Sequence, residues 1–131
     1  MLKEKNLQCV LHSAKDIMLH CDANKMQRVF DNLLRNAAIY SYSDTEITIT
    51  TELRANKVTI VFENCGANIP EEKLEQIFEQ FYRVDTARSM ANGGAGLGLA
   101  VARQITELHH GTISAASENE TIDFTVSLPL S

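Results

Sequence analysis

Two neighbouring strand patterns in the middle of the chain constrain its fold more than any other feature. Residues 45–53 (TEITITTEL) alternate apolar and polar side chains, whereas residues 57–64 (KVTIVFEN) carry apolar side chains on both faces. Alternation with a period of two is typical of a strand with one covered face, and a strand that is apolar on both faces belongs in the centre of a sheet. Ala55 and Asn56 lie between the two patterns and predict a hairpin turn.

Two helical patterns flank these strands. Residues 23–40 place apolar side chains at helical spacing, and Asp22 or Asn24 is the candidate N-cap. Residues 97–108 repeat this spacing, and the helix they predict ends near Gly111.

Further elements are predicted before, between and after these. After residues 65–69, Pro70 is expected near the first turn of a short helix, and the acidic residues that follow suit the helix dipole. Glu118 and Asn119 are expected to form the turn between the last two strands. The remaining strand patterns occupy residues 6–12, 16–21, 111–117 and 122–130. About six strands and three helices predict an α+β fold with one sheet and its helices on one face.

Composition narrows the class of protein. The chain has 131 residues, enough for one domain with a real core, and it carries a net charge of −5 without a cluster of Lys and Arg. A nucleic-acid partner is therefore not expected. No apolar run approaches the roughly 18 residues of a membrane span, and the first residues lack the apolar core of a signal peptide. The sequence thus predicts a cytosolic location for this domain.

The number and spacing of the cysteines and histidines do not indicate a metal site. Cys9, Cys21 and Cys65 are too few and too scattered for a disulfide framework or a Cys-x-x-Cys metal site. We expect them to be buried, small apolar side chains in a reducing compartment. The four histidines show no spacing typical of metal ligands.

Asn32, Asn36 and Tyr40 recur every fourth residue in the first helix. This spacing places all three on one helix face, beside the apolar stripe. Asparagine has a mediocre helix propensity, so two of them inside a helix carry a small cost. Their carbonyl oxygens suit Mg²⁺, which prefers oxygen ligands. For this helix taken alone, a solvated polar edge is an equally good interpretation.

A second polar feature ends the central strand. Glu63 and Asn64 are followed by Gly66, which permits a backbone conformation that a Cβ would hinder. The amide oxygen of Asn64 can accept a hydrogen bond from the exocyclic amine of a base. An Asx turn at the end of the strand is the alternative, and it is the commoner one when this segment is taken alone.

A cluster of glycines immediately precedes the second helix. A helix N-terminus presents unpaired N–H groups and the positive end of the dipole, and glycine lets a phosphate approach them. The spacing is neither G-x-x-x-x-G-K-[ST] nor G-x-G-x-x-G after a strand. Residues 79–92 have no clear period and predict a mobile loop, so a hinge is the alternative. The clustered glycines are Gly93, Gly94, Gly96 and Gly98.

Taken together, four segments resemble the ATP-binding catalytic domain of two-component sensor histidine kinases, a family that shares its nucleotide fold with gyrase, Hsp90 and MutL. Residues 31–41 (DNLLRNAAIYS) are similar to the N box, 63–70 (ENCGANIP) to the first glycine box, 77–85 (IFEQFYRVD) to the F box, and 93–105 (GGAGLGLAVARQI) to the second glycine box. They follow the family order and distances, over about residues 7–130. Residues 81–105 look most like the vancomycin-resistance sensor kinases. The resemblance implies a two-layer α/β sandwich with a mixed, mostly antiparallel sheet and three helices on one face.

The resemblance implies an adenine pocket. Tyr40 is expected to pack on adenine, and Asn64 to accept from the adenine amine, with Gly66 and Ile69 shaping the pocket. The family usually has an aspartate where Asn64 stands, so an acceptor is kept but a negative charge is lost, which predicts a lower affinity for adenine. Asn68 replaces a usual glycine and still tolerates a positive φ.

The resemblance also implies a phosphate and Mg²⁺ site. Asn36 is expected to ligate Mg²⁺, and Asn32 to contact phosphate or the waters of the metal. Arg83 and Arg88 match arginines that approach the phosphates. Ile39 stands where many relatives carry a basic residue, which shifts more of that role to the two arginines.

A lid over ATP is implied by the F box and the glycines. Phe78 and Phe81 are expected to anchor it, and Gly111 is all that remains of a third glycine box. The predicted phosphate-facing positions at the lid exit and helix start are Gly94, Gly96, Leu97, Gly98 and Leu99.

The implied chemistry is delivery of the γ-phosphoryl group of ATP to a histidine on another domain. Asn32, Arg83 and Arg88 are the expected catalytic residues. Asn32 stands where other ATPases of this superfamily use a carboxylate as general base, and an amide cannot take a proton. Slow or negligible ATP hydrolysis is therefore predicted. Residues 1–131 are expected to form the catalytic and ATP-binding domain alone, without a phosphoacceptor segment.

The resemblance further implies partners and a location. The expected partners are the histidine-bearing dimerisation domain of the same kinase and a cognate response regulator. The isolated domain is expected to be a monomer, and the full-length protein a homodimer whose catalytic domain is cytoplasmic and whose sensor is anchored in a bacterial membrane. Two alternatives are a serine kinase of the anti-sigma type, which shares these boxes, and a degenerate module that no longer binds ATP.

Overall fold

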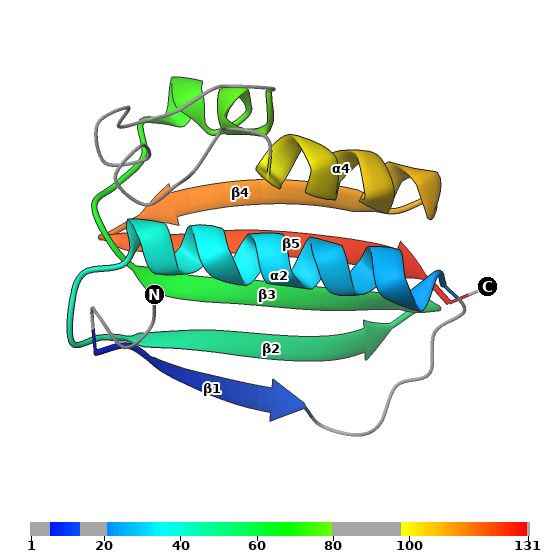
Figure 1. Cartoon of the computed structure of the whole chain (residues 1–131), viewed down its shortest axis with the longest axis horizontal. Coiled ribbons are helices and arrows are strands. Elements are labelled where there is room, and N and C mark those ends of the chain that lie inside the picture. Colours follow the sequence, from blue (N-terminus) through cyan, green and yellow to red (C-terminus); the bar gives the residue numbers. More distant parts are fainter. Residues whose placement is uncertain (1–5, 14–20, 80–97, 131) are drawn as a thin grey trace.

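The computed structural model describes residues 6–13, 21–79 and 98–130, which form two layers (Figure 1). One layer is a five-stranded sheet in the order β1-β2-β3-β5-β4, and the other contains α2 and α4 on a single face of it. β1 pairs with β2 in parallel, and the other neighbours are antiparallel. The strands are β1 (Gln8–Ser13), β2 (Glu46–Arg54), β3 (Lys57–Cys65), β4 (Thr112–Glu118) and β5 (Thr121–Pro129). The predicted α+β fold with a mixed, mostly antiparallel sheet is thus confirmed.

Two tight turns set the register of the sheet. Ala55 and Asn56 have φ of 50° and 64°, so the predicted hairpin between β2 and β3 is confirmed, and β3 is the central strand. This left-handed pair matches the right-handed twist of the strands it joins. The β4–β5 hairpin turns at Asn119 and Glu120, with φ of 55° and 59°. That turn lies one residue later than predicted, because Glu118 still pairs with Thr121.

Both α-helices bury an apolar stripe against the sheet. α2 (Ala23–Tyr40) is capped by Asp22, whose side chain accepts from the backbone N–H of Lys25 at 3.1 Å, so the first of the two candidate caps is confirmed. Val29 and Leu33 are fully buried within the same core as Phe124 of β5. α4 (Gly98–Leu108) runs beside α2 on the same face (Figure 1).

The end of α4 depends on two consecutive residues. His110 takes the left-handed conformation, with φ of 64°, and the N–H of Gly111 bonds to the carbonyl of Thr106 at 2.9 Å. A Cβ on Gly111 would collide with the backbone of Ser127. The predicted helix end near Gly111 is therefore confirmed, but close packing on β5 is what requires glycine at this position.

Three local predictions differ from the structure. The short helix after Pro70 is not an α-helix but two 3₁₀ turns, η1 (Glu71–Lys73) and η2 (Gln76–Phe78). The strand predicted over residues 16–21 lies outside the described residues apart from Cys21, which is not in a strand. The cysteines were predicted to be buried, and that prediction is wrong.

The exposure of the cysteines follows from sheet geometry. Side chains alternate along β3, so the burial of Asn64 on the helix side turns Cys65 to the opposite face. Cys9 lies on the edge strand β1. The free, exposed cysteines are Cys9, Cys21 and Cys65.

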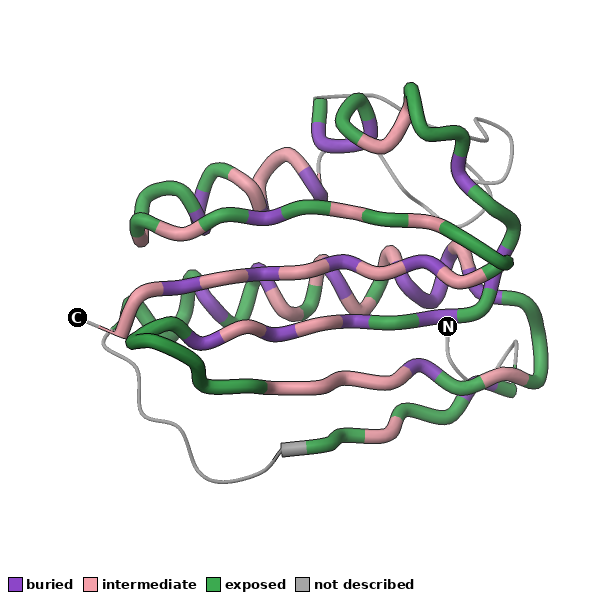
Figure 2. The backbone as a smooth tube through the Cα atoms, turned by 180° about the vertical axis from the view of Figure 1, so that it is seen from behind, coloured by how far each residue is buried: buried purple, intermediate pink, exposed green. Residues whose placement is uncertain are grey.

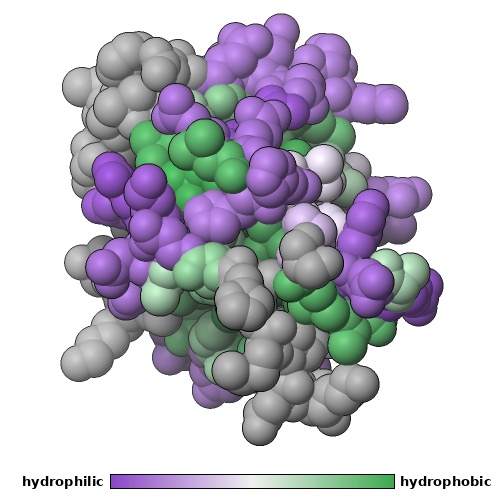
Figure 3. All heavy atoms as spheres, turned by 90° about the vertical axis from the view of Figure 1, so that its right-hand side faces the viewer, coloured by the Kyte–Doolittle hydropathy of each residue, from purple (hydrophilic) through white to green (hydrophobic). Residues whose placement is uncertain are grey.

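Along β3 and β5, most of the side chains that point away from the helices are polar. From behind, the sheet shows mostly intermediate and exposed residues between the buried ones (Figure 2). From the end at which α2 begins and α4 ends, hydrophilic side chains dominate and apolar ones gather in separate areas (Figure 3). No helix within the described ranges is long and apolar enough to cross a membrane.

Candidate nucleotide-binding site

The first part of the site lies where α2 faces the start of α4. The Nδ2 atom of Asn32 donates to the carbonyl oxygen of Gly98 at 3.1 Å, and the Nδ2 atom of Asn36 donates to the carbonyl oxygen of Asn32 at 2.8 Å. A Cβ built on Gly98 would lie 3.4 Å from Asn36 Nδ2 and 3.8 Å from Asn32 Oδ1. The two half-buried amides therefore contact the first turn of α4, whose N–H groups form the positive end of the helix dipole.

The second part joins the ends of α2 and β3. A Cβ on Gly66 would collide with the carbonyl oxygen of Tyr40, so only glycine allows these two segments to approach so closely. The N–H of Tyr42 bonds to the carbonyl of Cys65 at 2.8 Å and holds the chain there. The ring of Tyr40 lies 6.5 Å from that of Phe124, centroid to centroid. Residues far apart in sequence thus meet at one edge of the site.

Asn64 is the most unusual residue of this region. Its side chain is 0% exposed, yet neither Oδ1 nor Nδ2 has a hydrogen-bond partner among the residues that the structure describes. It pairs with Ile47 and Ile122, which are also fully buried. A buried polar group without a partner costs about 1–3 kcal/mol. The predicted alternative, an Asx turn, is not observed, because Asn64 lies within β3 and its side chain makes no such bond.

The loop after β3 is fastened to the β4–β5 hairpin. The N–H of Gly66 bonds to the carbonyl of Glu120 at 3.0 Å, and the Oδ1 atom of Asn68 accepts from the N–H of Glu120 at 2.7 Å. The N–H of buried Ile69 donates to Ser117 Oγ at 2.9 Å. These bonds hold Ile69 and Gly66 in fixed positions, and Gly66 lies beside Asn64.

Arg103 is a residue that the sequence analysis missed. Its guanidinium lies 4.9 Å from the centroid of the Phe78 ring and pairs with the carboxylates of Glu75 and Glu107. It therefore attaches η2, which contains the first two residues of the predicted F box, to α4. The spacing of Arg103 and Glu107 on one helix was visible in the sequence, but the contact with Glu75 depends on tertiary structure.

The remaining predicted positions are of two kinds. Phe78 and Leu99 are buried in the core, so their side chains serve packing, and the backbone of Leu99 belongs to the first turn of α4. Phe81, Arg83, Arg88, Gly94, Gly96 and Leu97 lie outside the described residues.

No group of three or more His, Cys, Asp or Glu that could hold a metal ion occurs in the described ranges. The predicted Mg²⁺ ligand is the amide oxygen of Asn36, and Asn32 is the predicted contact of a phosphate or of the waters of the metal. The donor set fits a hard cation that keeps several waters and phosphate oxygens.

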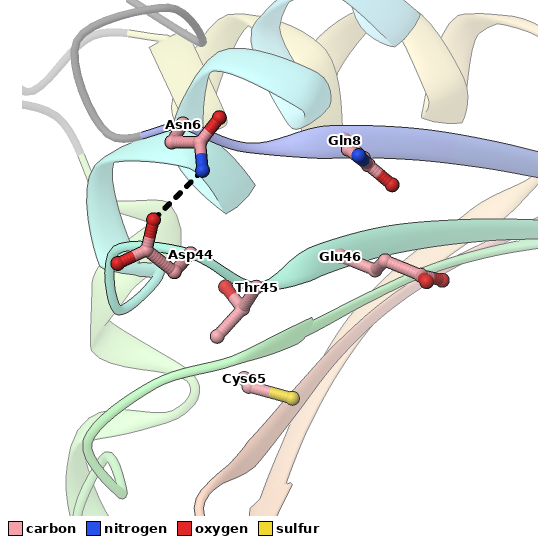
Figure 4. Close-up of a pocket in the computed structure, with 6 residues that line it drawn as sticks. All are labelled: Asn6, Gln8, Asp44, Thr45, Glu46 and Cys65. Atoms are coloured by element: carbon pink, nitrogen blue, oxygen red, sulfur yellow. Dashed lines mark hydrogen bonds between the residues drawn. The ribbon is translucent and has the colours of Figure 1, made fainter.

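A separate hollow lies on the other face of the sheet (Figure 4). Cys65 lines it and is adjacent to Asn64 on β3, but successive side chains of a strand point to opposite faces. A hydrogen bond of 2.8 Å from Asn6 Nδ2 to Asp44 Oδ1 spans part of it. Among the predicted site residues that the structure describes, none lines this hollow, whose lining is Asn6, Gln8, Asp44, Thr45, Glu46 and Cys65.

Comparison with known proteins identifies the class. Residues 21–131 match the model of the histidine kinase-, DNA gyrase B- and HSP90-like ATPases. The fold is similar to the solved catalytic domain of histidine kinase ThkA, with a TM-score of 0.85 and 29% identity, over 98% of this chain and 82% of that one. The chain belongs to this ATPase family and is the ATP-binding catalytic domain of a two-component sensor histidine kinase.

Within this family, the chain is similar to two particular sensor proteins. The chain is 48% identical to the sensor protein VanS of Enterococcus faecium over 93% of its own length and 32% of that protein. It is 43% identical to VanSC of Enterococcus gallinarum, over 98% of its length and 36% of that protein. The predicted resemblance to the vancomycin-resistance sensor kinases is thus confirmed. The chain spans about a third of the length of these relatives.

Proposed function

We propose that this domain binds ATP with Mg²⁺ and donates the γ-phosphoryl group to a histidine on the dimerisation domain of the same sensor kinase. The observation that carries the proposal is the amide of Asn64, which has no hydrogen-bond partner among the described residues and is fully buried beside the Gly66–Tyr40 contact. A buried amide with both polar atoms free is explained by a ligand that supplies the missing bonds.

The base of the nucleotide would occupy this end of the site. A bond from the exocyclic amine of adenine to Asn64 Oδ1 would remove the cost of the unsatisfied acceptor. Gly66 and Ile69 border the position, and both are fastened by the bonds of the loop to Glu120 and Ser117. We propose that the ring of Tyr40 packs on the base.

The phosphates would lie between α2 and the start of α4. The first turn of α4 supplies unpaired N–H groups and a partial positive charge. Asn32 and Asn36 each donate through Nδ2 to a backbone carbonyl. These bonds do not use the Oδ1 atoms, which are the candidate ligand atoms. Asn36 is our candidate ligand for Mg²⁺, and Asn32 for a phosphate or a water of the metal. When bound, Mg²⁺ neutralises charge on the transferred phosphoryl group.

In the proposed phosphoryl transfer, this domain positions ATP and neutralises charge, and none of its residues forms a covalent bond to the phosphoryl group. A ring nitrogen of the acceptor histidine forms a bond to the γ-phosphorus, the bond from that phosphorus to the bridging oxygen breaks, and ADP leaves. Asn32 cannot act as a general base, because an amide does not take up a proton at neutral pH. We therefore propose slow hydrolysis by the isolated domain, with Arg83 and Arg88 approaching the phosphates from the lid.

The remaining proposals concern the whole protein. We propose that residues 1–131 act as the catalytic domain and that the acceptor histidine belongs to a dimerisation domain elsewhere in the protein. A response regulator is the proposed recipient of the phosphoryl group; histidine kinase ThkA, solved in complex with the response regulator TrrA, has a similar fold at 26% identity and a TM-score of 0.81. We further propose a monomeric isolated domain and a homodimeric, membrane-anchored kinase with this domain in the bacterial cytoplasm.

Calorimetric titration with Mg²⁺ and a non-hydrolysable ATP analogue tests the binding proposal. We expect saturable binding by the wild type and a loss of at least about tenfold in affinity for Asn64→Leu, which keeps the branched shape and the number of heavy side-chain atoms but removes both polar atoms. Asn24→Leu, on the exposed start of α2, is the matched control and should bind as the wild type does. Absence of binding at millimolar analogue by folded wild type would contradict the proposal.

A phosphotransfer assay tests the acceptor. We expect transfer to a histidine-bearing dimerisation domain and none to a serine-bearing partner. Transfer to serine alone would favour a serine kinase of the anti-sigma type instead.

A further inference from the structure

The orientation of the Asn64 amide distinguishes it from the other amides near the site. Asn32 and Asn36 each donate through Nδ2 to a backbone carbonyl, and Asn68 accepts through Oδ1 from a backbone N–H. These bonds fix which side of each amide carries the nitrogen. The side chain of Asn64 makes no hydrogen bond within the described part of the chain, so no bond there fixes which side of its amide carries Nδ2 and which carries Oδ1.

The neighbouring strand residues do not fix the orientation of the Asn64 amide either. Its partners across the sheet are Ile47 and Ile122, whose apolar side chains neither donate nor accept. The backbone groups of β3 are used in pairing with β2 and β5. Gly66 lies close by, and a Cβ built on it would be 3.3 Å from Asn64 Nδ2. Rotation of the amide by 180° exchanges a donor for an acceptor at almost no change in shape.

Purine bases differ in the pattern that they present to such a group. A 6-aminopurine such as adenine offers a donor at its amine and an acceptor at N1. A 6-oxopurine such as hypoxanthine offers an acceptor at O6 and a donor at N1. An amide complements the first pattern in one orientation and the second in the other, whereas a carboxylate only accepts and would repel O6.

We propose that Asn64 allows this pocket to bind 6-oxopurine nucleotides about as well as adenine nucleotides. The inference rests on the proposed function, because it requires that the base lies against Asn64. A site that holds its ligand through a fixed donor or acceptor binds a mismatched analogue much more weakly, because the mismatch leaves a buried polar group without a partner. A freely oriented amide avoids that mismatch for both bases.

The direct test compares ADP with IDP, which differ at the 6 position and N1 but not in sugar or phosphates. Calorimetric titration of the wild-type domain with Mg²⁺ should give dissociation constants within about tenfold of one another. If ADP binds and IDP binds more weakly than that, the inference is wrong and the proposed function stands. If neither binds to folded protein, the proposed function fails as well.

The variant Asn64→Asp tests whether the amide of Asn64 is the reason that both nucleotides bind. It should increase the preference for ADP over IDP by at least about tenfold, because the carboxylate can only accept. Asn24→Asp adds the same charge at the exposed start of α2 and should leave the preference unchanged. An unchanged preference in folded Asn64→Asp would overturn the inference. Should that variant not fold, Asn64→Leu replaces it: both nucleotides should bind more weakly by similar factors, and unchanged affinity for both would overturn the inference.

Discussion

The imidazole of His109 joins the end of α4 to the beginning of α2. Its Nε2 atom accepts from the backbone N–H of Asp22 at 3.1 Å, and its Nδ1 atom lies 2.9 Å from the carbonyl oxygen of Ile105. The ring therefore pairs the backbone N–H of the residue that caps one helix and gives a second contact to a carbonyl in the last turn of the other, which also accepts from the N–H of His109 at 3.2 Å. The contact lies at the far end of the two helices from Asn36 and Gly98 (Figure 1).

His109→Ala should lower the free energy of unfolding by about 1–2 kcal/mol, since two hydrogen bonds are lost and the N–H of Asp22 depends on water instead. Urea denaturation followed by circular dichroism measures the change. His110→Ala is not a clean control, because His110 has a positive φ. Gln104→Ala, on the exposed face of α4, is a better one, and a loss as large as that of His109→Ala would contradict the role of the imidazole.

Gly66→Ala should destabilise the domain by about 2–4 kcal/mol, because the new Cβ would meet the carbonyl oxygen of Tyr40 and force α2 and β3 apart. Gly98→Ala is the matched comparison, since its Cβ finds its nearest neighbour at 3.4 Å and alanine is the better helix former. Chemical denaturation of both variants measures the difference. Equal stabilities would show that the close approach at Gly66 is not required.

Arg103→Ala should loosen η2 from α4, because the variant loses the cation–π contact with Phe78 and the ion pair with Glu75. We expect a loss of about 1 kcal/mol and faster amide hydrogen exchange at residues 76–79. Arg54→Ala removes an ion pair with Glu52 between two exposed side chains and should cost less than about 0.5 kcal/mol. Unchanged exchange in Arg103→Ala would count against the attachment.

Asp123 faces Glu63 directly across the β3–β5 ladder, on the side of the sheet away from the helices. Burial raises the pKa of the Asp123 carboxyl above its ordinary value of 3.8, and the negative charge of Glu63 adds to the effect. A raised folded-state pKa means that the folded protein holds its proton more tightly than the unfolded chain does. The charged form therefore destabilises the fold above that pKa, and the penalty diminishes as the pH falls through it.

Asp123→Asn should accordingly raise the melting temperature at pH 7 by about 1–3 °C, as expected when like charges opposite one another are removed from a sheet. The gain should shrink as the pH is lowered through the raised pKa toward 3.8. Differential scanning calorimetry at several pH values measures it. A gain that is constant over this range would point to a cause other than the carboxylate charge.

Much of the fold was predictable because strand and helix periods are local properties of the chain. The central position of β3 and the turn at Ala55 and Asn56 followed from neighbouring residues, which also narrowed the cap of α2 to Asp22 or Asn24. The segment after Pro70 did not, because its 3₁₀ turns of three residues each are too short to show a period. Cys65 was wrongly predicted to be buried because the face it occupies depends on how β3 sits against the helices.

The sequence by itself determined the family, through four motifs in order, and the types of the long elements, through hydrophobic period. Only the tertiary structure decided that the side chain of Asn64 is buried with no hydrogen-bond partner in the described ranges and that Gly66 lies against Tyr40. It also decided that Asn32 reaches the carbonyl of Gly98. Such contacts join the ends of separate elements, so they depend on sheet register and helix docking, which arise from the summed packing of the whole core and not from any local pattern.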